Sequence, residues 1–355
     1  MKTVRFAIVG CGRIAQRHAH HIIEHSFASL DATFDIKEEA AKQLAAGSSA
    51  KPFSSFSDLL KDPSIDIVNI CTPNGTHHEL ATQSLKAGKH VLIEKPMAIT
   101  KEECEDIIST AFSCDKKVFV VKQNRYNPPV QALKELVDEG RLGRLYFVSV
   151  NCFWNRNDQY YLSSDWKGTR LLDGGTLYTQ FSHFVDVLYY LFGDIVSPKG
   201  VIKNVSHADL IEFEDTGSFV FHFKNGALGN FNYTTSSYKQ NMEGSLTVFA
   251  EKGTIKIGGK YLNTIDYQLL EDFVIEDLPQ SNPSNDYGYY EGSMSNHDRV
   301  IDNAVRALNG SEKIMTNAFD GMKVVEIIEK MYEAAGYSPR RSIGTGSQQQ
   351  EAVVQ

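Results

Sequence analysis

A lysine ends an apolar run in the stretch HVLIEKPMA, residues 90–98. Lysine is almost never buried without a partner or a task, and Lys95 follows a segment apolar enough to be an internal strand. An amine whose pKa is lowered by burial and by a nearby positive charge can transfer a proton near neutral pH. Lys95 is therefore a candidate catalytic base. The alternative is a lysine whose only task is to pair with Glu94.

A glycine-rich stretch, VGCGRIA, follows the first apolar run and precedes a helical pattern. In this G-x-G-x-x-A spacing, Gly10 allows a tight turn, Gly12 lets the backbone approach a pyrophosphate, and Ala15 permits close helix packing. The N-terminus of the helix adds N–H groups and a positive dipole. The stretch predicts a dinucleotide site, and the alternative is a glycine turn without a cofactor. The expected contacts are Gly10, Gly12, Arg13 and Ile14.

Asp35 follows the second apolar run, about 20 residues after the glycines, where a carboxylate accepts hydrogen bonds from the adenosine ribose. A carboxylate there repels a 2′-phosphate, and Ile36 is no phosphate ligand, so the sequence favours NAD over NADP. Lys37 is a cation close to this position, so the sequence does not exclude NADP as the cofactor.

Four histidines, His18, His20, His21 and His25, follow the glycines within one predicted helix. Three of them have the spacing i, i+3, i+7 near one helical face, which raises the question of a metal site. No acidic or cysteine ligand accompanies them at metal spacing. We expect an ordinary packing helix and no metal.

The elements that must position these residues begin with alternating strands and helices. This alternation predicts βαβ units, a doubly wound parallel sheet and an α/β fold class. Ligands of such a sheet lie beyond the carboxyl ends of its strands, where Lys95 and residues 72–74 fall. The expected strands are 5–10, 29–35, 66–73, 90–95 and 117–124, and the expected helices are 13–25, 37–46, 77–88 and 101–115.

After residue 124 the pattern changes to a helix, 128–140, and long β-branched and aromatic runs. The turns KNGAL and EKGTI within these runs are typical of hairpins, so a largely antiparallel sheet is predicted. The runs are 144–154, 217–237, 243–259 and 263–278, and helices are expected at 296–308 and 319–335. We expect a Rossmann domain at 1–123, an α+β substrate and oligomerisation domain at 124–337, and a disordered tail at 338–355.

Composition excludes several classes of protein. Of the 355 residues, 42% are hydrophobic and 23% charged, as in an ordinary globular protein. The net charge of −8 provides no field for nucleic acid or anionic membrane, so neither is an expected partner. Five scattered cysteines without a C-x-x-C pair indicate neither disulfides nor a zinc knuckle. With no apolar run near the roughly 20 residues of a spanning helix, a soluble cytoplasmic protein is expected.

The stretches VGCGRIA, CTPNGTHH, EKP and DGGTLYTQFSHFVD together resemble the glucose-fructose oxidoreductase, inositol dehydrogenase and MocA family over nearly the whole chain. The resemblance implies NAD-dependent oxidation of a CH–OH group. By position, the family's catalytic EKP lysine is Lys95, and its substrate-contacting histidine in the second domain is His183. The alternative for His183 is a core histidine bonded to Asp186. The family's usual aspartate four residues before the histidine is replaced by Thr179, which argues against a simple inositol dehydrogenase.

The family resemblance also implies the other site residues. Cofactor contacts are expected from Thr72, Pro73, Asn74, His77, Glu94, Lys95, Gln123, Trp166 and Lys167, in addition to the glycine loop and Asp35. Substrate contacts are expected from Lys95, Arg125, Arg156, Tyr160, Tyr161, Thr179 and His183. The arginines suit carboxylate and phosphate groups, although each could be a solvated surface residue. The tyrosines could stack on a base or sugar, or simply pack. His297 is a further candidate for a substrate contact.

Longer stretches, such as DWKGTRLLDGGTLYTQFSHFVD and LTVFAEKGTIKIGG, are similar to one bacterial branch, the UDP-N-acetyl-2-amino-2-deoxyglucuronate 3-dehydrogenases. This resemblance implies oxidation of a sugar C3 hydroxyl for surface polysaccharide synthesis and a homodimer or homotetramer. It leaves open whether NADH leaves or is reoxidised by 2-oxoglutarate. Three alternatives stay open: a dehydrogenase of another sugar or cyclitol, an NAD-dependent glycosidase that oxidises C3 transiently, and a non-catalytic NAD sensor.

Overall fold

The computed structural model describes residues 1–338 and divides them into two compact units. The first unit contains Met1–Val121 and His297–Met322, and the second contains Lys122–Asn296 and the described residues from Lys323 onward. The segment 297–322, which we expected in the second domain, thus belongs with the first unit. The expected tail at 338–355 lies, apart from residue 338, outside the described residues.

The first unit is built on a six-stranded sheet in the order β3-β2-β1-β4-β5-β6, with every pair parallel. This is the doubly wound order, and its switch point lies between β1 and β4. The predicted parallel sheet is confirmed. β3 was not predicted, because it has only three residues and one is proline. The strands are β1 (Val4–Val9), β2 (Ala28–Phe34), β3 (Lys51–Phe53), β4 (Ile67–Ile70), β5 (His90–Ile93) and β6 (Val118–Val120).

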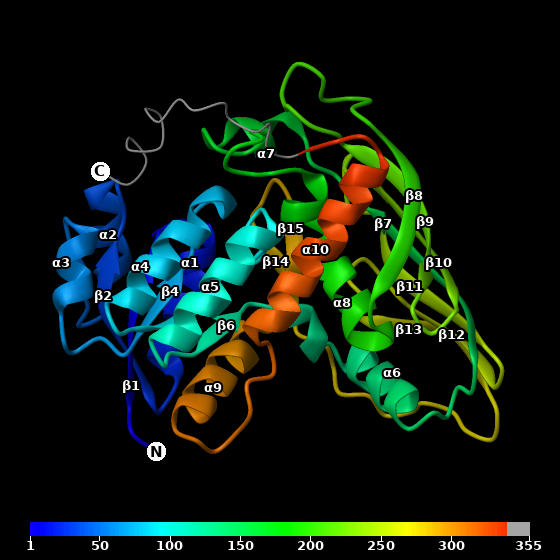
Figure 1. The fold of residues 1–355 in the computed structure, drawn as a ribbon, viewed down its shortest axis with the longest axis horizontal. Coiled ribbons are helices and arrows are strands. Elements are labelled where there is room, and N and C mark those ends of the chain that lie inside the picture. Colours follow the sequence, from blue (N-terminus) through cyan, green and yellow to red (C-terminus); the bar gives the residue numbers. More distant parts are fainter. Residues whose placement is uncertain (339–355) are drawn as a thin grey trace. The chain divides into compact units, whose positions relative to one another are not determined.

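β4 is buried along its whole length, and β1 and β5 are buried at all but one residue each, because helices cover both faces of a doubly wound sheet. Figure 1 shows these helices in blue and cyan, with α9 in orange. The helices are α1 (Arg13–Glu24), α2 (Glu38–Ala45), α3 (Phe56–Lys61), α4 (His77–Lys86), α5 (Lys101–Ser113) and α9 (His297–Leu308), with a 3-10 turn η1 (Asn74–Thr76) before α4.

The second unit is built on a seven-stranded sheet in the order β13-β12-β11-β7-β10-β9-β8. All pairs are antiparallel except β7 with β10, so the prediction of a mostly antiparallel sheet is confirmed. The two predicted hairpins are β9–β10 and β11–β12. The strands are β7 (Leu145–Phe153), β8 (Ile195–Lys203), β9 (Thr216–Phe223), β10 (Leu228–Thr234), β11 (Glu243–Ala250), β12 (Gly253–Gly258) and β13 (Thr264–Leu270).

One face of this larger sheet is covered and the other is open. Burial alternates along β9, where Phe219 and Phe221 are buried while Val220 and His222 are exposed. Figure 1 shows α6 and α8 on one side of the sheet.

The remaining elements are η2 (Gln123–Tyr126), α6 (Pro128–Asp138), α7 (Asp158–Leu162), a π-helical segment η3 (Leu177–Phe181), α8 (Ser182–Phe192), β14 (Ser284–Asp286), β15 (Glu291–Met294) and α10 (Ala318–Ala334). Among the described residues, no helix is both long and apolar enough to cross a membrane.

Candidate active site

The glycine loop lies between β1 and α1. Gly10 has a φ of +85°, and a Cβ at this position would lie 2.7 Å from Cγ2 of Thr72, so only glycine fits against the loop after β4. A Cβ on Gly12 would meet no heavy atom within 4 Å. Gly12 is the N-cap of α1, and the first turn of a helix has backbone N–H groups without partners inside the helix. The loop thus has the room and the donors that a pyrophosphate requires.

Asp35, directly after β2, is tied to this loop. Its Oδ2 accepts a hydrogen bond from the backbone N–H of Cys11 at 2.7 Å, and its Oδ1 accepts one from the N–H of Lys37 at 2.8 Å. A carboxylate has lone pairs left for ribose hydroxyls after two such bonds. Burial and Asp35 raise the pKa of the Cys11 thiol to about 12, so this thiol is not a nucleophile.

His77 connects the loops that follow β4 and β5. Its ring is fully buried, with Nδ1 2.8 Å from the carbonyl oxygen of Pro96 and Nε2 2.9 Å from that of Thr72. Both ring nitrogens therefore face backbone, which favours a role in holding the two loops together over a direct cofactor contact. Asn74, on η1, is also buried.

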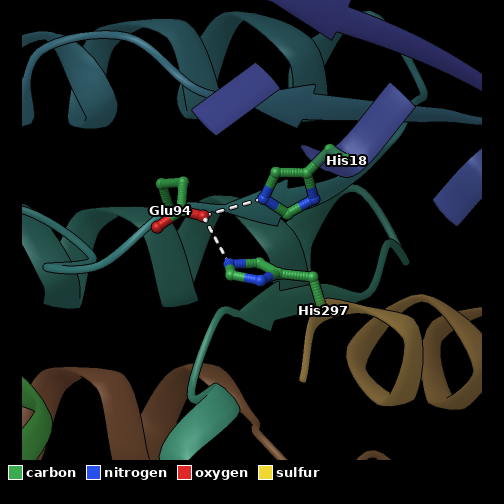
Figure 2. A group of neighbouring side chains, drawn as sticks. All are labelled: His18, Glu94 and His297. Carbon is green, nitrogen blue, oxygen red and sulfur yellow. Dashed lines mark hydrogen bonds and ion pairs between the residues drawn. The ribbon is translucent and has the colours of Figure 1, made fainter. Parts of the chain in front are cut away.

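Glu94 is the first residue after β5, and two histidines face it (Figure 2). Its Oε1 lies 2.7 Å from Nε2 of His18 and 3.7 Å from Nε2 of His297. The sequence has no acidic ligand at metal spacing from the α1 histidines, and the fold brings Glu94 to His18 from 76 residues further along the chain. His297, expected at the substrate, is fully buried against Glu94. The backbone N–H of Lys95 donates to Oε2 of Glu94 at 3.1 Å, and Lys95 itself is half-buried.

In the second unit, His183 lies in the first turn of α8, directly after the π-helical segment η3. Its Nε2 is 3.2 Å from Oγ of Ser293, which also accepts a hydrogen bond from Nε2 of Gln123 at 2.8 Å. Oε1 of Gln123 is buried and has no hydrogen-bond partner among the described residues. π-Helical segments are frequent at functional sites. Ser293 was not singled out from sequence, because nothing local distinguishes it from other serines.

The glycine pair before η3 packs against Tyr332 of α10. A Cβ on Gly175 would lie 2.3 Å from the Tyr332 hydroxyl oxygen. That hydroxyl accepts a hydrogen bond from the N–H of Leu177 at 3.0 Å and donates one to Oε1 of Glu214 at 2.7 Å. Glu214 and Tyr332 thus hold the segment that leads to His183.

Thr179, at the position of the family's usual aspartate, donates a hydrogen bond to the carboxylate of Asp173. Asp173 is 1% exposed, and its Oδ2 also accepts from the N–H of Gly168 at 2.8 Å. The structure therefore brings a carboxylate to Thr179 from six residues upstream. Sequence reasoning missed Asp173, although it stands directly before the glycine pair.

The two arginines predicted to bind substrate are both buried and hydrogen-bonded inside the unit. Arg125 forms a two-point ion pair with Asp186. Arg156 is 2% exposed, and its Nε donates to Oε1 of Gln180 at 2.6 Å. Its guanidinium carbon also lies 5.0 Å from the ring centroid of Trp154. These contacts favour structural roles for both arginines.

Tyr160 and Tyr161 are each 4% exposed and form a buried cluster with Ile211 and Phe213. The packing alternative therefore describes both tyrosines better than stacking on a ligand. Lys167 lies over the Tyr160 ring at 4.1 Å, and its Nζ donates to Oγ of Ser163 at 3.0 Å. Trp166 is half-buried, and the predicted cofactor contacts of Trp166 and Lys167 stay predictions.

Comparison with known proteins agrees with this geometry. The family described as "Oxidoreductase family, NAD-binding Rossmann fold" matches residues 4–122, and the "GFO/IDH/MocA C-terminal domain" matches residues 130–256. The chain belongs to the GFO/IDH/MocA oxidoreductase family. As a member of this family it is an NAD-dependent oxidoreductase.

Two solved structures are similar to nearly the whole chain. The WlbA dehydrogenase from Bordetella pertussis, in complex with NADH and UDP-GlcNAcA, is 34% identical, covers 94% of this chain and 97% of its own, and has a TM-score of 0.85. The WlbA dehydrogenase from Chromobacterium violaceum, with the same two ligands, is 35% identical over 95% of this chain and 94% of its own, also with a TM-score of 0.85. Myo-inositol 2-dehydrogenase from Thermotoga maritima is 27% identical over 71% of this chain and 74% of its own length.

Proposed function

We propose that this protein oxidises the C3 hydroxyl of a UDP-N-acetylglucosaminuronate-type sugar to a ketone, with NAD as the hydride acceptor. The observation that carries the proposal is the similarity, over nearly the whole chain, to two dehydrogenases that hold UDP-GlcNAcA. The similarity to the inositol dehydrogenase is lower and covers less of the chain.

The arrangement around Thr179 supports a substrate other than a simple cyclitol. Where the inositol dehydrogenases of this family usually carry an aspartate, this chain has a hydroxyl bonded to Asp173. A neutral side chain at that position adds no negative charge of its own. The carboxylate there belongs to Asp173 instead, so this chain departs from the inositol dehydrogenases in the residue that presents the carboxylate.

The reaction needs a base for the hydroxyl proton while the C3 hydrogen leaves as hydride. NAD, when bound, accepts that hydride and becomes NADH. Lys95 and His183 are the candidates for the base. A positioned base contributes about 10² to 10⁴ in rate. Orientation of the sugar contributes more, because it removes the entropy cost of bringing the reacting atoms together.

We further propose that the ketone is made for bacterial surface polysaccharide, since a 3-keto sugar is the substrate that a later transamination requires. A homodimer or homotetramer is the proposed assembly. The NADH is either released or reoxidised by 2-oxoglutarate, and the experiment below separates the two.

The test is incubation of the purified protein with UDP-N-acetylglucosaminuronate and excess NAD, with and without 2-oxoglutarate. NADH absorbance and the mass of the sugar are followed together. A sugar two hydrogens lighter supports the proposal, and formation of more than one equivalent per protein only with 2-oxoglutarate indicates recycling. UDP-N-acetylglucosamine, which lacks the carboxylate, is the matched control substrate. An unchanged sugar under both conditions rejects the proposed substrate.

A second candidate function, a dehydrogenase of another sugar or cyclitol, is favoured by the match to the inositol dehydrogenase. It is tested in the same assay with myo-inositol in place of the nucleotide sugar. Turnover of myo-inositol together with an unchanged nucleotide sugar would replace the first proposal with this one.

A further inference from the structure

Three side chains that are far apart in the sequence meet at one buried carboxylate oxygen in the first unit. His18 comes from α1, Glu94 from the end of β5, and His297 from the start of α9. Both histidines are fully buried, and Glu94 is 5% exposed. Figure 2 shows both imidazole rings directed at the same oxygen of Glu94. The rings stand nearly perpendicular, with their centroids 5.1 Å apart.

This arrangement keeps Glu94 ionised inside the protein. Burial alone would raise its pKa, but the interactions with His18 and His297 outweigh burial and hold the pKa well below its usual range. A buried carboxylate is tolerated only when hydrogen bonds replace the water it has lost. The 2.7 Å contact from His18 is a charge-assisted hydrogen bond. Nε2 of His297 is at the longer distance of 3.7 Å from the same oxygen, and its interaction also lowers the pKa of Glu94.

The second oxygen of Glu94 connects the cluster to Lys95. Oε2 accepts a hydrogen bond from the backbone N–H of Lys95 at 3.1 Å. The N–H of Glu94 itself donates to the carbonyl of Ile70 at 3.0 Å, which ties this residue to β4. The main chain at Lys95 is thus held from one side by the sheet and from the other by a carboxylate that His18 orients.

The distances fit hydrogen bonding better than a metal ion. Two ligand atoms on one zinc ion stand about 3.3 Å apart, given Zn–N bonds of about 2.0 Å and tetrahedral angles. The His18 Nε2 to Glu94 Oε1 distance is 2.7 Å, which is too short for that arrangement. Histidines that bind metals almost always donate their second ring N–H to a partner. Nδ1 of His18 and Nδ1 of His297 have no hydrogen-bond partner among the described residues.

We propose that His18 and His297 are positioning residues for Lys95: they orient Glu94, and Glu94 fixes the main chain from which the Lys95 side chain reaches the nicotinamide. The same contacts join α1, whose N-terminus is at the glycine loop, to the loop that carries Lys95. His18 makes the larger contribution of the two histidines, since its Nε2 is 2.7 Å from Glu94 Oε1 and that of His297 is 3.7 Å away. The inference rests on the proposed catalytic role of Lys95.

The test compares His18→Leu, which keeps bulk but removes the donor, with His18→Gln, which restores a donor near the position of Nε2. His297→Leu tests the second histidine in the same way. His20→Gln is the matched control, because His20 is an exposed histidine on the same helix. Each full-length variant is measured for thermal unfolding, NADH affinity, kcat with the proposed substrate, and metal content of the purified protein. The rate at which a small amine reagent modifies Lys95, relative to exposed Lys37, is measured by peptide mass mapping.

We expect His18→Leu to keep NADH affinity and lower kcat about 100-fold, the cost of a displacement of roughly 1 Å at a reacting group. His297→Leu should lower kcat less, and His18→Gln should recover most of the loss. Modification of Lys95 should be faster in His18→Leu, because its main chain is less restrained. The control should match the wild type in every measurement.

Wild-type kcat and wild-type Lys95 modification in a folded His18→Leu variant would overturn the inference. So would one equivalent of a transition metal in the wild type that is lost in the histidine variants, because the cluster would then be a metal site. If the protein does not oxidise the proposed substrate, the modification rate of Lys95 still tests whether His18 and His297 position Lys95. Wild-type turnover in a Lys95→Met variant would reject the catalytic role of Lys95 and, with it, the inference that His18 and His297 position a catalytic residue.

Discussion

The carboxylate of Asp186 accepts two hydrogen bonds from the guanidinium of Arg125: Nε donates to Oδ2 at 2.9 Å and Nη2 donates to Oδ1 at 2.7 Å. Nζ of Lys122 lies 3.5 Å from Oδ1, and each of the three side chains is 4% exposed or less. Burial would raise the pKa of Asp186, and the two cations keep it below its usual value. Asp186 lies one turn after His183 on α8, so this ion pair anchors the helix that presents the histidine.

Arg125→Met tests whether this arginine is structural. Removing one partner of a buried ion pair leaves the other charge uncompensated, at a cost of about 3–5 kcal/mol. We expect the free energy of unfolding to fall by that amount in chemical denaturation. The Arg125→Met/Asp186→Asn double variant should recover part of the loss. A rise in KM with unchanged stability would instead identify Arg125 as a substrate ligand.

Asp35→Ala tests the cofactor preference. The variant loses the acceptor for the ribose hydroxyls and the bonds to Cys11 and Lys37, so NADH affinity should fall about tenfold or more. NADPH affinity should fall less or rise, because the repulsion of a 2′-phosphate is removed. Titration of the variant with each reduced cofactor, followed by the cofactor's fluorescence, measures the NADH and NADPH affinities. Glu38→Ala, at an exposed carboxylate three residues on, is the control. An equal loss for both cofactors would argue that Asp35 only shapes the loop.

Lys95→Met and His183→Gln test the choice of base. Replacement of the base should lower kcat by about 10² to 10⁴ and leave NADH affinity unchanged. Replacement of a residue that only orients the sugar should raise KM more than it lowers kcat. Steady-state rates and NADH titration for both variants distinguish these roles. Wild-type rates in both would remove the two side chains from the mechanism.

Glu214 predicts a pH dependence of stability. Burial raises its pKa from 4.5 to about 7 in the folded protein, against the opposing effect of the hydrogen bonds from Tyr332 and Tyr233. Because the folded pKa is above the unfolded one, protonated Glu214 stabilises the fold below about pH 4.5. That contribution is lost as the pH rises through 7, by about 1.4 kcal/mol for each unit of pKa difference.

Glu214→Gln keeps the acceptor oxygen and cannot ionise, so its free energy of unfolding should lack this fall between pH 4.5 and 7. Glu333→Gln, an exposed residue next to Tyr332 on α10, should keep the wild-type profile. Chemical denaturation across this pH range provides the comparison. Identical profiles for the wild type and Glu214→Gln would show that Glu214 does not titrate in this window.

The first unit was the more predictable part of the chain. Its strands are apolar runs because both faces of a parallel sheet are buried. Gly10 has a φ of +85°, a backbone conformation that few other residues adopt, so a glycine at this position can be predicted from the turn. The hairpins of the second unit were equally local, since Asn-Gly and Lys-Gly turns specify them. β8 was missed because Pro198 and Gly200, residue types that strands rarely contain, lie in the middle of its nine residues.

The sequence by itself determined that the glycine loop, Asp35 and Lys95 stand at the ends of strands. Their positions could be predicted because each depends only on the residue types along one continuous segment. Only the tertiary structure decided which distant side chains meet. His18, Glu94 and His297 come from three segments, and Arg125 and Arg156 proved to be buried and paired inside their own unit. A charged side chain has the same local sequence signal whether it binds a ligand or a partner in the core, and burial, which distinguishes the two, depends on contacts between segments far apart in the chain.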